Sequence, residues 1–224
     1  DRPRSNVAFR WRDVVDSYQF RFAASTPERS FGEGEDTSRW HLRYGLSAST
    51  ESVSSEATQT FTDIDRSFEQ PRGQYLDGGR YINGAGFITG RWTRSWLTLE
   101  LGTRATLTAA DAPGDDASGS APVDQRFGTI VGRGGAQAQL APGWFLELNL
   151  DQGFRAPNLD DLTARQQVGP GFQFENADLR PERSMTSELG VRGANEHLEL
   201  SAWVFTTRIN DGIQRAVRES GDCP

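Results

Sequence analysis

Apolar side chains recur at every second position of residues 144–150, which read Trp-Phe-Leu-Glu-Leu-Asn-Leu. Successive side chains of a β-strand point to opposite faces of the sheet, so this alternation predicts a strand with one apolar and one polar face. We expect Leu146, Leu148 and Leu150 on the apolar face and Glu147 on the polar face.

The same alternation recurs along the rest of the chain, and no stretch of comparable length shows helical periodicity. The sequence therefore predicts an antiparallel all-β protein with about ten strands, which lie near residues 5–12, 17–24, 38–50, 56–66, 79–92, 95–108, 126–140, 143–155, 184–193 and 197–208. Several of these strands exceed the length of about 5–6 residues that is usual in soluble domains.

The predicted connections alternate between short and long. Tight turns are expected at residues 93–95, 141–143 and 194–196, and long polar segments near residues 25–37, 67–78, 109–125 and 156–183. A transmembrane β-barrel has this asymmetry, because short periplasmic turns line one rim and longer extracellular loops line the other. The sequence thus favours a transmembrane barrel whose four long segments are extracellular.

Composition limits the classes of function. The chain of 224 residues carries 24 basic and 31 acidic side chains, for a net charge of −7, and it contains no lysine. Such an acidic chain has no electrostatic footprint for nucleic acid, so we expect no nucleic-acid partner. No apolar run is long enough for a transmembrane helix, whereas a transmembrane strand needs only about 9–11 residues.

The residue types that carry catalysis or bind metals are sparse. His41 and His197 are far apart, and Cys223 is the single cysteine. This excludes an internal disulfide and a cysteine-based zinc site. We expect no catalytic residues, no metal site and no cofactor.

Arginines on the polar faces of the strands have two interpretations. Those expected to face the barrel lumen could attract anions, or they could pair with inward carboxylates such as Glu100 and Glu147. The arginines concerned are Arg10, Arg21, Arg43, Arg91 and Arg133.

Two motifs flank the long segment near residues 156–183. The first is formed by Phe154, Arg155, Ala156 and Pro157, and the second by Asn176, Asp178 and Leu179, followed by Pro181 and Glu182. This succession resembles the TonB-dependent outer-membrane receptors, in which a Phe-Arg-Ala-Pro box and an Asn-Pro-Asp/Asn-Leu box flank one extracellular loop of a 22-stranded barrel. Ala177 stands where the second box has proline, and the specific similarity covers residues 144–213.

The resemblance implies active uptake of a scarce nutrient, usually an iron–siderophore complex, haem or cobalamin. In this family an inner-membrane TonB complex supplies energy through a short box that precedes a plug domain. Neither the box nor the plug is recognisable here, so we expect an internal barrel segment that lacks the plug and the C-terminal strands. Its partners would be outer-membrane lipid of a Gram-negative bacterium, the rest of its own barrel and plug, the TonB complex and a small chelate.

The loop between the motifs offers candidate ligand contacts. A fixed positive charge, amides and aromatic faces suit a bulky, oxygen-rich, often anionic chelate. The candidates are Arg165, Gln166, Gln167, Phe172 and Phe174. Haem receptors of this family place a histidine between the two boxes, and this sequence has none there, so haem is disfavoured.

Three points stay open at the level of sequence. A passive outer-membrane pore or structural barrel, without plug and TonB box, has the same strand pattern. A soluble extracellular β-domain that binds glycans also has alternating strands, but it would not need detergent. Strand parity places Cys223 on the extracellular side, where we expect a disulfide to a residue outside the chain, with a free thiol as the alternative.

Overall fold

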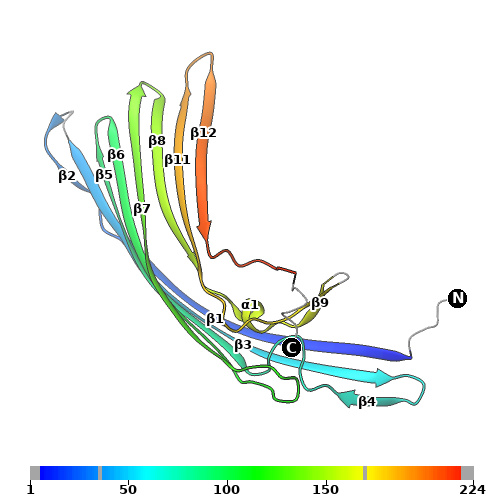
Figure 1. The fold of residues 1–224 in the computed structure, drawn as a ribbon. Helices are drawn as coiled ribbons and strands as arrows, with labels where there is room; N and C mark the ends of the chain where they lie inside the picture. The colour runs from blue at the N-terminus through cyan, green and yellow to red at the C-terminus, as the bar shows by residue number, and fades with distance from the viewer. Residues whose placement is uncertain (1–5, 35–36, 169–170, 218–224) are drawn as a thin grey trace.

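A computed structural model describes residues 6–34, 37–168 and 171–217 of the chain. These residues form one antiparallel sheet that curves into a trough (Figure 1). The long strands follow one another across the sheet in chain order: β1 (Val7–Ser25), β3 (Ser38–Phe61), β5 (Gly79–Arg94), β6 (Leu97–Ala112), β7 (Val123–Ala141), β8 (Trp144–Arg155), β11 (Glu182–Ala194) and β12 (Glu199–Asn210).

Short elements complete the fold. The strands β2 (Arg29–Phe31) and β4 (Arg66–Glu69) both pair with β3, which brings the sheet to ten strands within the described residues. The connection between β8 and β11 contains the helix α1 (Leu159–Thr163) and a separate hairpin of β9 (Gln166–Val168) and β10 (Gly171–Gln173). The predicted antiparallel all-β architecture is confirmed, with β1 and β12 at the two edges of an unclosed sheet. No helix of the described part of the chain is long and apolar enough to cross a membrane.

Two strand boundaries differ from the prediction. The expected segments 5–12 and 17–24 belong to the single strand β1. The expected segment 38–50 and the first part of 56–66, up to Phe61, belong to the single strand β3, and a turn follows. The ladder runs without a shift from Val7 opposite Phe61 to Ser25 opposite Arg43. Polar residues such as Asp13 interrupt the apolar alternation, but they do not end the strand, because the ladder is held by backbone hydrogen bonds.

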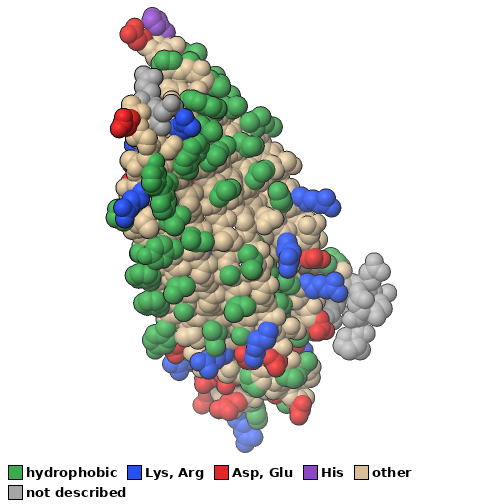
Figure 2. All heavy atoms as spheres, turned by 90° about the vertical axis from the view of Figure 1, so that its left-hand side faces the viewer, with side chains coloured by type: hydrophobic (Ala, Val, Ile, Leu, Met, Phe, Trp, Pro, Cys, Tyr) green, Lys and Arg blue, Asp and Glu red, His purple; other side chains and the backbone are tan. Residues whose placement is uncertain are grey.

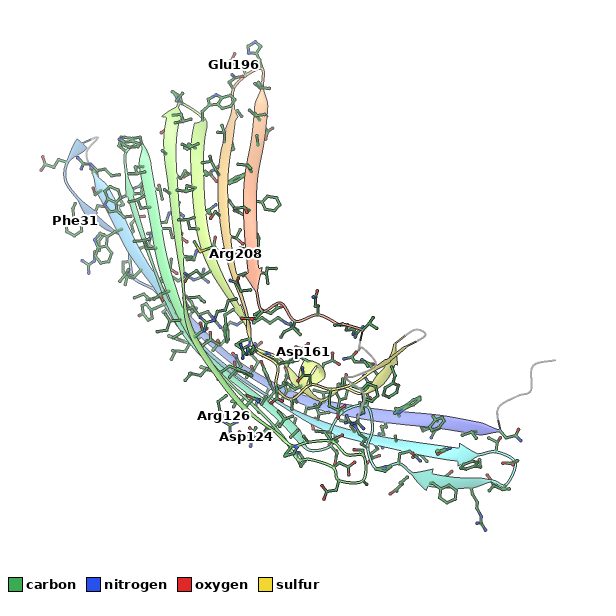
Figure 3. The ribbon with its side chains drawn as sticks, viewed as in Figure 1. Phe31, Asp124, Arg126, Asp161, Glu196 and Arg208 are labelled. Carbon is green, nitrogen blue, oxygen red and sulfur yellow. The ribbon has the colours of Figure 1, made fainter. Side chains whose placement is uncertain are left out.

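The longer strands move one predicted loop to the other rim. Ser38, at the end of the connection 25–37, lies opposite Arg94, which precedes the tight turn between β5 and β6. The connection 25–37 therefore shares a rim with the short turns, and the prediction that it lies with the other three long loops is wrong. Phe31 and Glu196 mark the short-turn rim in Figure 3.

The two faces of the sheet differ in character. Figure 2 shows the convex face, where hydrophobic side chains are spread over the strands and charged side chains gather mainly at one end and along the margins. Leu148 and Leu150 belong to the exposed apolar row of this face. Glu147 lies in the opposite, concave row, where its carboxylate accepts a hydrogen bond from Gln137 Nε2 at 2.8 Å. The predicted division between leucine and glutamate faces agrees with this arrangement.

Arg10 lies opposite Thr58, an odd number of positions from the concave pair of Asp13 and Ser55. It therefore belongs to the convex row, and the expectation that it faces inward is wrong.

A small hydrophobic core lies on the concave face, near the rim of the three remaining long loops. Leu76, from the connection before β5, and Leu162 of α1 pack there with Ala110 and Ala112 of β6 and Val123 of β7. Burial of these apolar side chains fixes the loops onto the inner wall of the trough.

Candidate functional site

Three connections that are far apart in the sequence meet over the concave face: residues 70–78, 113–122 and 156–181. Figure 1 shows α1 and β9, from the third connection, inside the trough. The backbone N–H of Arg165 donates to the carbonyl oxygen of Gln74 at 2.8 Å, which ties the third connection to the first. We call this assembly the loop layer.

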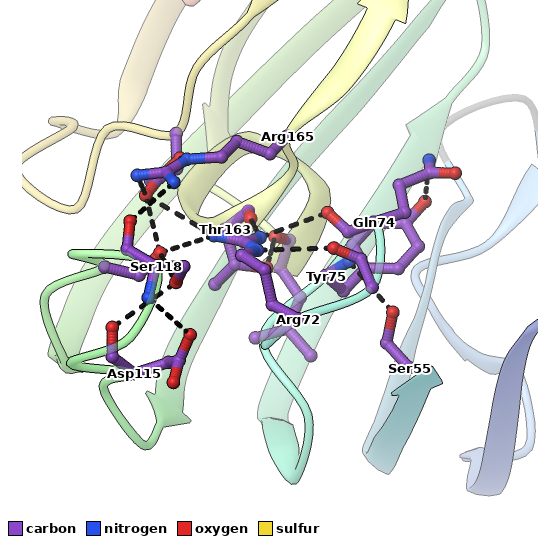
Figure 4. Close-up of polar contacts among 12 residues, drawn as sticks. Ser55, Arg72, Gln74, Tyr75, Asp115, Ser118, Thr163 and Arg165 are labelled. Carbon is purple, nitrogen blue, oxygen red and sulfur yellow. Dashed lines mark hydrogen bonds and ion pairs between the residues drawn. The ribbon is translucent and has the colours of Figure 1, made fainter. Parts of the chain in front are cut away.

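Arg72 lies at the centre of the loop layer, and its side chain is only 7% exposed. Its guanidinium donates to Ser120 Oγ at 2.7 Å and to the carbonyl oxygens of Gln74 and Thr163 (Figure 4). Burial lowers the pKa of this guanidinium, and the Glu175 carboxylate, 3.4 Å away, opposes that effect. One arginine thus contacts residues of all three connections.

Glu175 links Arg72 to a second arginine. Its two carboxylate oxygens accept hydrogen bonds from Arg165 Nε and Nη2 at 2.6 and 2.7 Å. Arg165 also donates to the carbonyl oxygen of Ser118 at 2.8 Å. Burial by itself would raise the pKa of the Glu175 carboxyl, but the hydrogen bonds and charge of Arg165 lower it below its ordinary value. Bidentate pairing of this kind is both strong and directional, so it holds two parts of the third connection together. The bond from Arg165 to Ser118, and one from Ser120 Oγ to Glu175 at 3.0 Å, tie that connection to the second.

A second polar network joins the loop layer to the sheet. Ser55 Oγ, on β3, donates to the Asp13 carboxylate of β1 and accepts from the backbone N–H of Tyr75 at 3.0 Å. The Tyr75 hydroxyl donates to Asp160 Oδ1 at 3.2 Å. Burial, and then Asp160, raise the pKa of this hydroxyl, which keeps it protonated as a donor.

The first motif shapes the start of the third connection. Arg155 forms ion pairs with Asp161 at 2.7 Å and with Glu182 at 3.6 Å. Asn158 caps α1, because its side chain accepts from the Asp161 N–H at 2.8 Å while the Asp161 carboxylate accepts from the Asn158 N–H at 3.1 Å. Phe154 is the last but one residue of β8, Ala156 follows the strand, and Pro157 is buried.

The second motif shapes the return to the sheet. The Asn176 side chain accepts from the backbone N–H of Asp178 at 3.0 Å, and Leu179 packs against the hydrophobic core. Pro181 then precedes β11, whose first residue is Glu182. The motif residues therefore build the loop, and the contacts described for them are with other parts of the chain.

The hairpin of β9 and β10 carries the remaining candidate ligand contacts. Gln167 and Phe172 are backbone partners in it. The rings of Phe172 and Phe174 meet edge to face, with centroids 5.2 Å apart, and these residues are 56% and 47% exposed. The Gln166 side-chain oxygen instead accepts from Gln74 Nε2 at 2.9 Å.

The structure divides the predicted ligand contacts into two kinds. The aromatic pair presents open ring surface, whereas the charge of Arg165 is already matched by Glu175. Arg72 and Glu175 were not predicted, because no local pattern links two residues that meet only in the folded chain.

Cys223 lies outside the described residues. Within those residues, no group of three or more His, Cys, Asp or Glu side chains could hold a metal ion.

The sequence was compared with protein-family models and with curated proteins. The family model for the TonB-dependent receptor-like β-barrel matches residues 3–223. Comparison with curated proteins gave no match.

Solved structures of similar fold were found as well. A double mutant of the Serratia marcescens hemophore receptor HasR, in complex with its hemophore HasA and heme, has a TM-score of 0.67 and 17% identity, over 91% of this chain and 34% of that one. The copper transporter OprC has a TM-score of 0.66 and 16% identity, over 88% of this chain and 30% of that one. The siderophore receptor PiuA from Acinetobacter baumannii has a TM-score of 0.54 and 12% identity, over 86% and 32%. The chain thus spans about a third of these proteins and shares their fold over that part.

Proposed function

Because the chain belongs to the TonB-dependent receptor β-barrel family, we propose that it is part of an outer-membrane receptor that takes up an iron–siderophore complex or a similar chelate. The receptor would lie in the outer membrane of a Gram-negative bacterium, with its long-loop rim outside the cell. Further strands would complete the barrel, and a plug and the TonB complex would be its partners.

One observation carries the proposal: the three long connections of one rim are fastened together over the concave face. Arg72, Arg165 and Glu175 hold them by ion pairs and hydrogen bonds. A passive pore needs an open lumen, so loops held over the wall favour a receptor that captures its ligand at the rim. The apolar convex face also favours a lipid-embedded wall over a soluble glycan-binding domain.

The chemistry of the loop layer favours a chelate with organic, partly aromatic groups. Phe172 and Phe174 present half-exposed rings at its surface, and such rings stack on planar ligand groups. A haem-iron ligand is less well supported, because His41 lies in β3 and His197 in the turn before β12, on the other rim. Both positions are away from the loop layer.

The aromatic pair gives the test. We expect the complete receptor with Phe172→Ala and Phe174→Ala to take up radiolabelled iron from its siderophore on the order of tenfold more slowly, because exposed aromatic anchors carry much of the binding energy of such sites. Catecholate, hydroxamate and carboxylate siderophores would be tried in cells that express the receptor. Phe31→Ala, an exposed aromatic on the opposite rim, is the matched control, and heat-modifiable mobility in gels reports barrel assembly.

Unchanged uptake by the assembled double variant would show that the hairpin is not the ligand site. Uptake of haem or copper in place of all the siderophores would contradict the proposed ligand class.

A further inference from the structure

The strands β1 and β3 continue past the other strands on the long-loop rim (Figure 1). The strand β5 begins at Gly79, which lies opposite Val53 of β3. Residues 54–61 of β3 therefore run on beyond β5, paired with residues 7–14 of β1 on one side and in part with β4 on the other. Eight residues of a strand span about 25 Å. We call these parts of β1, β3 and β4 the wall extension.

The apolar row of β1 changes face where the wall extension begins. Along the wall this row is convex, and its exposed aromatic members are Tyr18, Phe20 and Phe22. In the extension, Phe9 and Trp11 stand an even number of positions from Asp13, which belongs to the concave row. Because side chains alternate along a strand, both aromatic residues lie on the concave face.

The convex row of the wall extension is polar instead. Its charged members are Arg10, Arg12, Glu56 and Glu69. Charged side chains are unfavourable against the hydrocarbon of a bilayer. In the complete receptor the extension would therefore stand outside the membrane, and its apolar inner face would border the mouth and not lipid.

The strand register sets out the inner face of the extension in rows across β1, β3 and β4. From the tip inwards, the rows are Val7, Phe61 and Arg66, then Phe9, Gln59 and Phe68, then Trp11 and Ala57. Residues directly opposite each other in an antiparallel pair have Cβ atoms about 4.5–5.5 Å apart. Four aromatic residues and one arginine thus share a single patch, which we call the aromatic platform: Phe9, Trp11, Phe61, Phe68 and Arg66.

The platform presents open ring surface and an unpaired charge. The rings of Phe9 and Trp11 stack with centroids 5.8 Å apart and planes 15° from parallel, and those of Phe61 and Phe68 meet edge to face at 5.9 Å. Phe9, Trp11 and Phe68 are 52%, 59% and 50% exposed. Arg66 is exposed, and within the described ranges it forms neither an ion pair nor a hydrogen bond.

The platform borders the loop layer on the side away from the short turns. The first connection of the loop layer bonds to the carbonyl oxygens of Val53 and Ala57 on β3, through the N–H groups of Gly78 and Gln70. The platform continues from Ala57 to the tip of β3. The loop layer therefore separates the platform from the part of the lumen that a plug would fill.

We propose that the aromatic platform binds anionic aromatic rings of the ligand, so that the chelate taken up is a catecholate or a phenolate. This deepens the proposed function and rests on it. Flat rings stack on Phe9 and Trp11, while the guanidinium of Arg66 pairs with the oxygens that the ring carries. A hydroxamate or carboxylate chelate would satisfy Arg66 but offers no ring to the stacked pair.

The test measures equilibrium binding of two radiolabelled iron(III) probes to the complete receptor in detergent. One is the complex with catechol, which supplies aromatic rings, and the other is the complex with acetohydroxamate, which has none. We expect the catechol complex to bind, and Trp11→Ala with Phe68→Ala to weaken its binding about tenfold, because stacking is lost at two positions. Arg66→Gln should weaken it about fivefold through loss of the charge.

Matched controls remove the same groups elsewhere. Trp96→Ala deletes an exposed tryptophan from the tight turn between β5 and β6, on the other rim. Arg10→Gln deletes a charge from the convex face of the same extension. Both should leave binding of the catechol complex within about twofold of the unaltered receptor. Heat-modifiable mobility in gels reports barrel assembly for every variant.

Two further variants separate stacking from simple burial of apolar surface. Trp11→Phe keeps a ring and should retain most of the binding, whereas Trp11→Leu keeps apolar bulk without a ring and should bind as weakly as Trp11→Ala. Equal binding by the phenylalanine and leucine replacements would overturn the stacking role.

Other outcomes would overturn the platform as a whole. They are unchanged binding of the catechol complex by the assembled Trp11→Ala and Phe68→Ala variant, or an unaltered receptor that binds only the acetohydroxamate complex. The second result would still leave siderophore uptake standing. Because this experiment records binding without transport and alters no residue of the β9–β10 hairpin, its failure and the failure of the uptake test are distinguishable.

Discussion

Glu175 is the residue on which the loop layer depends most directly. It lies between Arg72, which is 7% exposed, and Arg165, which is 23% exposed. We expect Glu175→Gln to destabilise the loop layer by about 2–4 kcal/mol, somewhat less than the cost of breaking a fully buried pair, because Arg165 is partly solvated. Hydrogen exchange of residues 70–78 and 156–181 in the complete receptor measures this. Glu28→Gln, which removes an ion pair with Arg39 between half-exposed partners, should change protection little.

The pH dependence of the same contact has a definite sign. The folded pKa of Glu175 is lowered, so its stabilising effect is fully present above the ordinary glutamate pKa of about 4.3 and is lost as the pH falls through the lowered value. Loop protection, corrected for intrinsic exchange, should therefore hold steady from neutral pH to about pH 5 and decline in stronger acid. Identical profiles for the unaltered receptor and for Glu175→Gln would contradict this role.

Residue-scale contacts were the hardest to predict from sequence. Arg165 was expected to offer its charge to a ligand, but the folded chain brings Glu175 against it. The hairpin of β9 and β10 lies between Arg165 and Glu175 in the sequence. The two side chains meet only because the chain turns back on itself after this hairpin. By contrast, the Asn158 cap follows from local sequence, since Asn158 and Asp161 stand three positions apart at a helix start.

At the scale of elements, period-2 alternation located the strands well and their ends poorly. The strands β5 to β8 match the predicted segments closely, because each is bounded by a turn with glycine, proline or serine. The strands β1 and β3 were each predicted as two segments, because polar residues such as Asp13 and Glu51 interrupt the apolar alternation between those segments. Once each pair of segments is joined into one strand, β1 ends at the other rim of the sheet. The connection 25–37 therefore lies on the short-turn rim and not on the predicted long-loop rim.

The orientation of β8 gives a prediction at this scale. Leu148 belongs to the convex row and Asn149 to the concave row, where it lines a polar recess. In the complete receptor in lipid, we expect Leu148→Arg to lower the free energy of unfolding by about 2–4 kcal/mol at mid-membrane depth, because the charge would face hydrocarbon. Asn149→Arg, its neighbour and matched control, should cost much less. Urea unfolding in vesicles measures both, and a larger cost for Asn149→Arg would mean that the register is wrong by one residue.

At the scale of the whole molecule, the described residues form a wall with two faces and two open edges. Its convex face is apolar, its concave face holds the loop layer, and β1 and β12 stand at its margins. The sequence predicted the two faces from alternation alone. It did not predict which distant loops meet over the concave face, because that depends on the curvature of the sheet.

The open edges give a prediction for residues 1–224 taken alone. The strand β1 has 19 residues and β12 has 12, and in the sheet each pairs with a neighbour on one side. In a lipid-like medium each unsatisfied backbone group costs several kcal/mol, so an edge of this length is strongly unfavourable. We expect the isolated chain to refold in detergent into mixed oligomers joined through these edges, whereas the complete receptor refolds as a monomer under the same conditions. Size-exclusion chromatography and unheated gels report the difference, and a sharp, heat-modifiable monomer of residues 1–224 would show that the edges are satisfied within the chain itself.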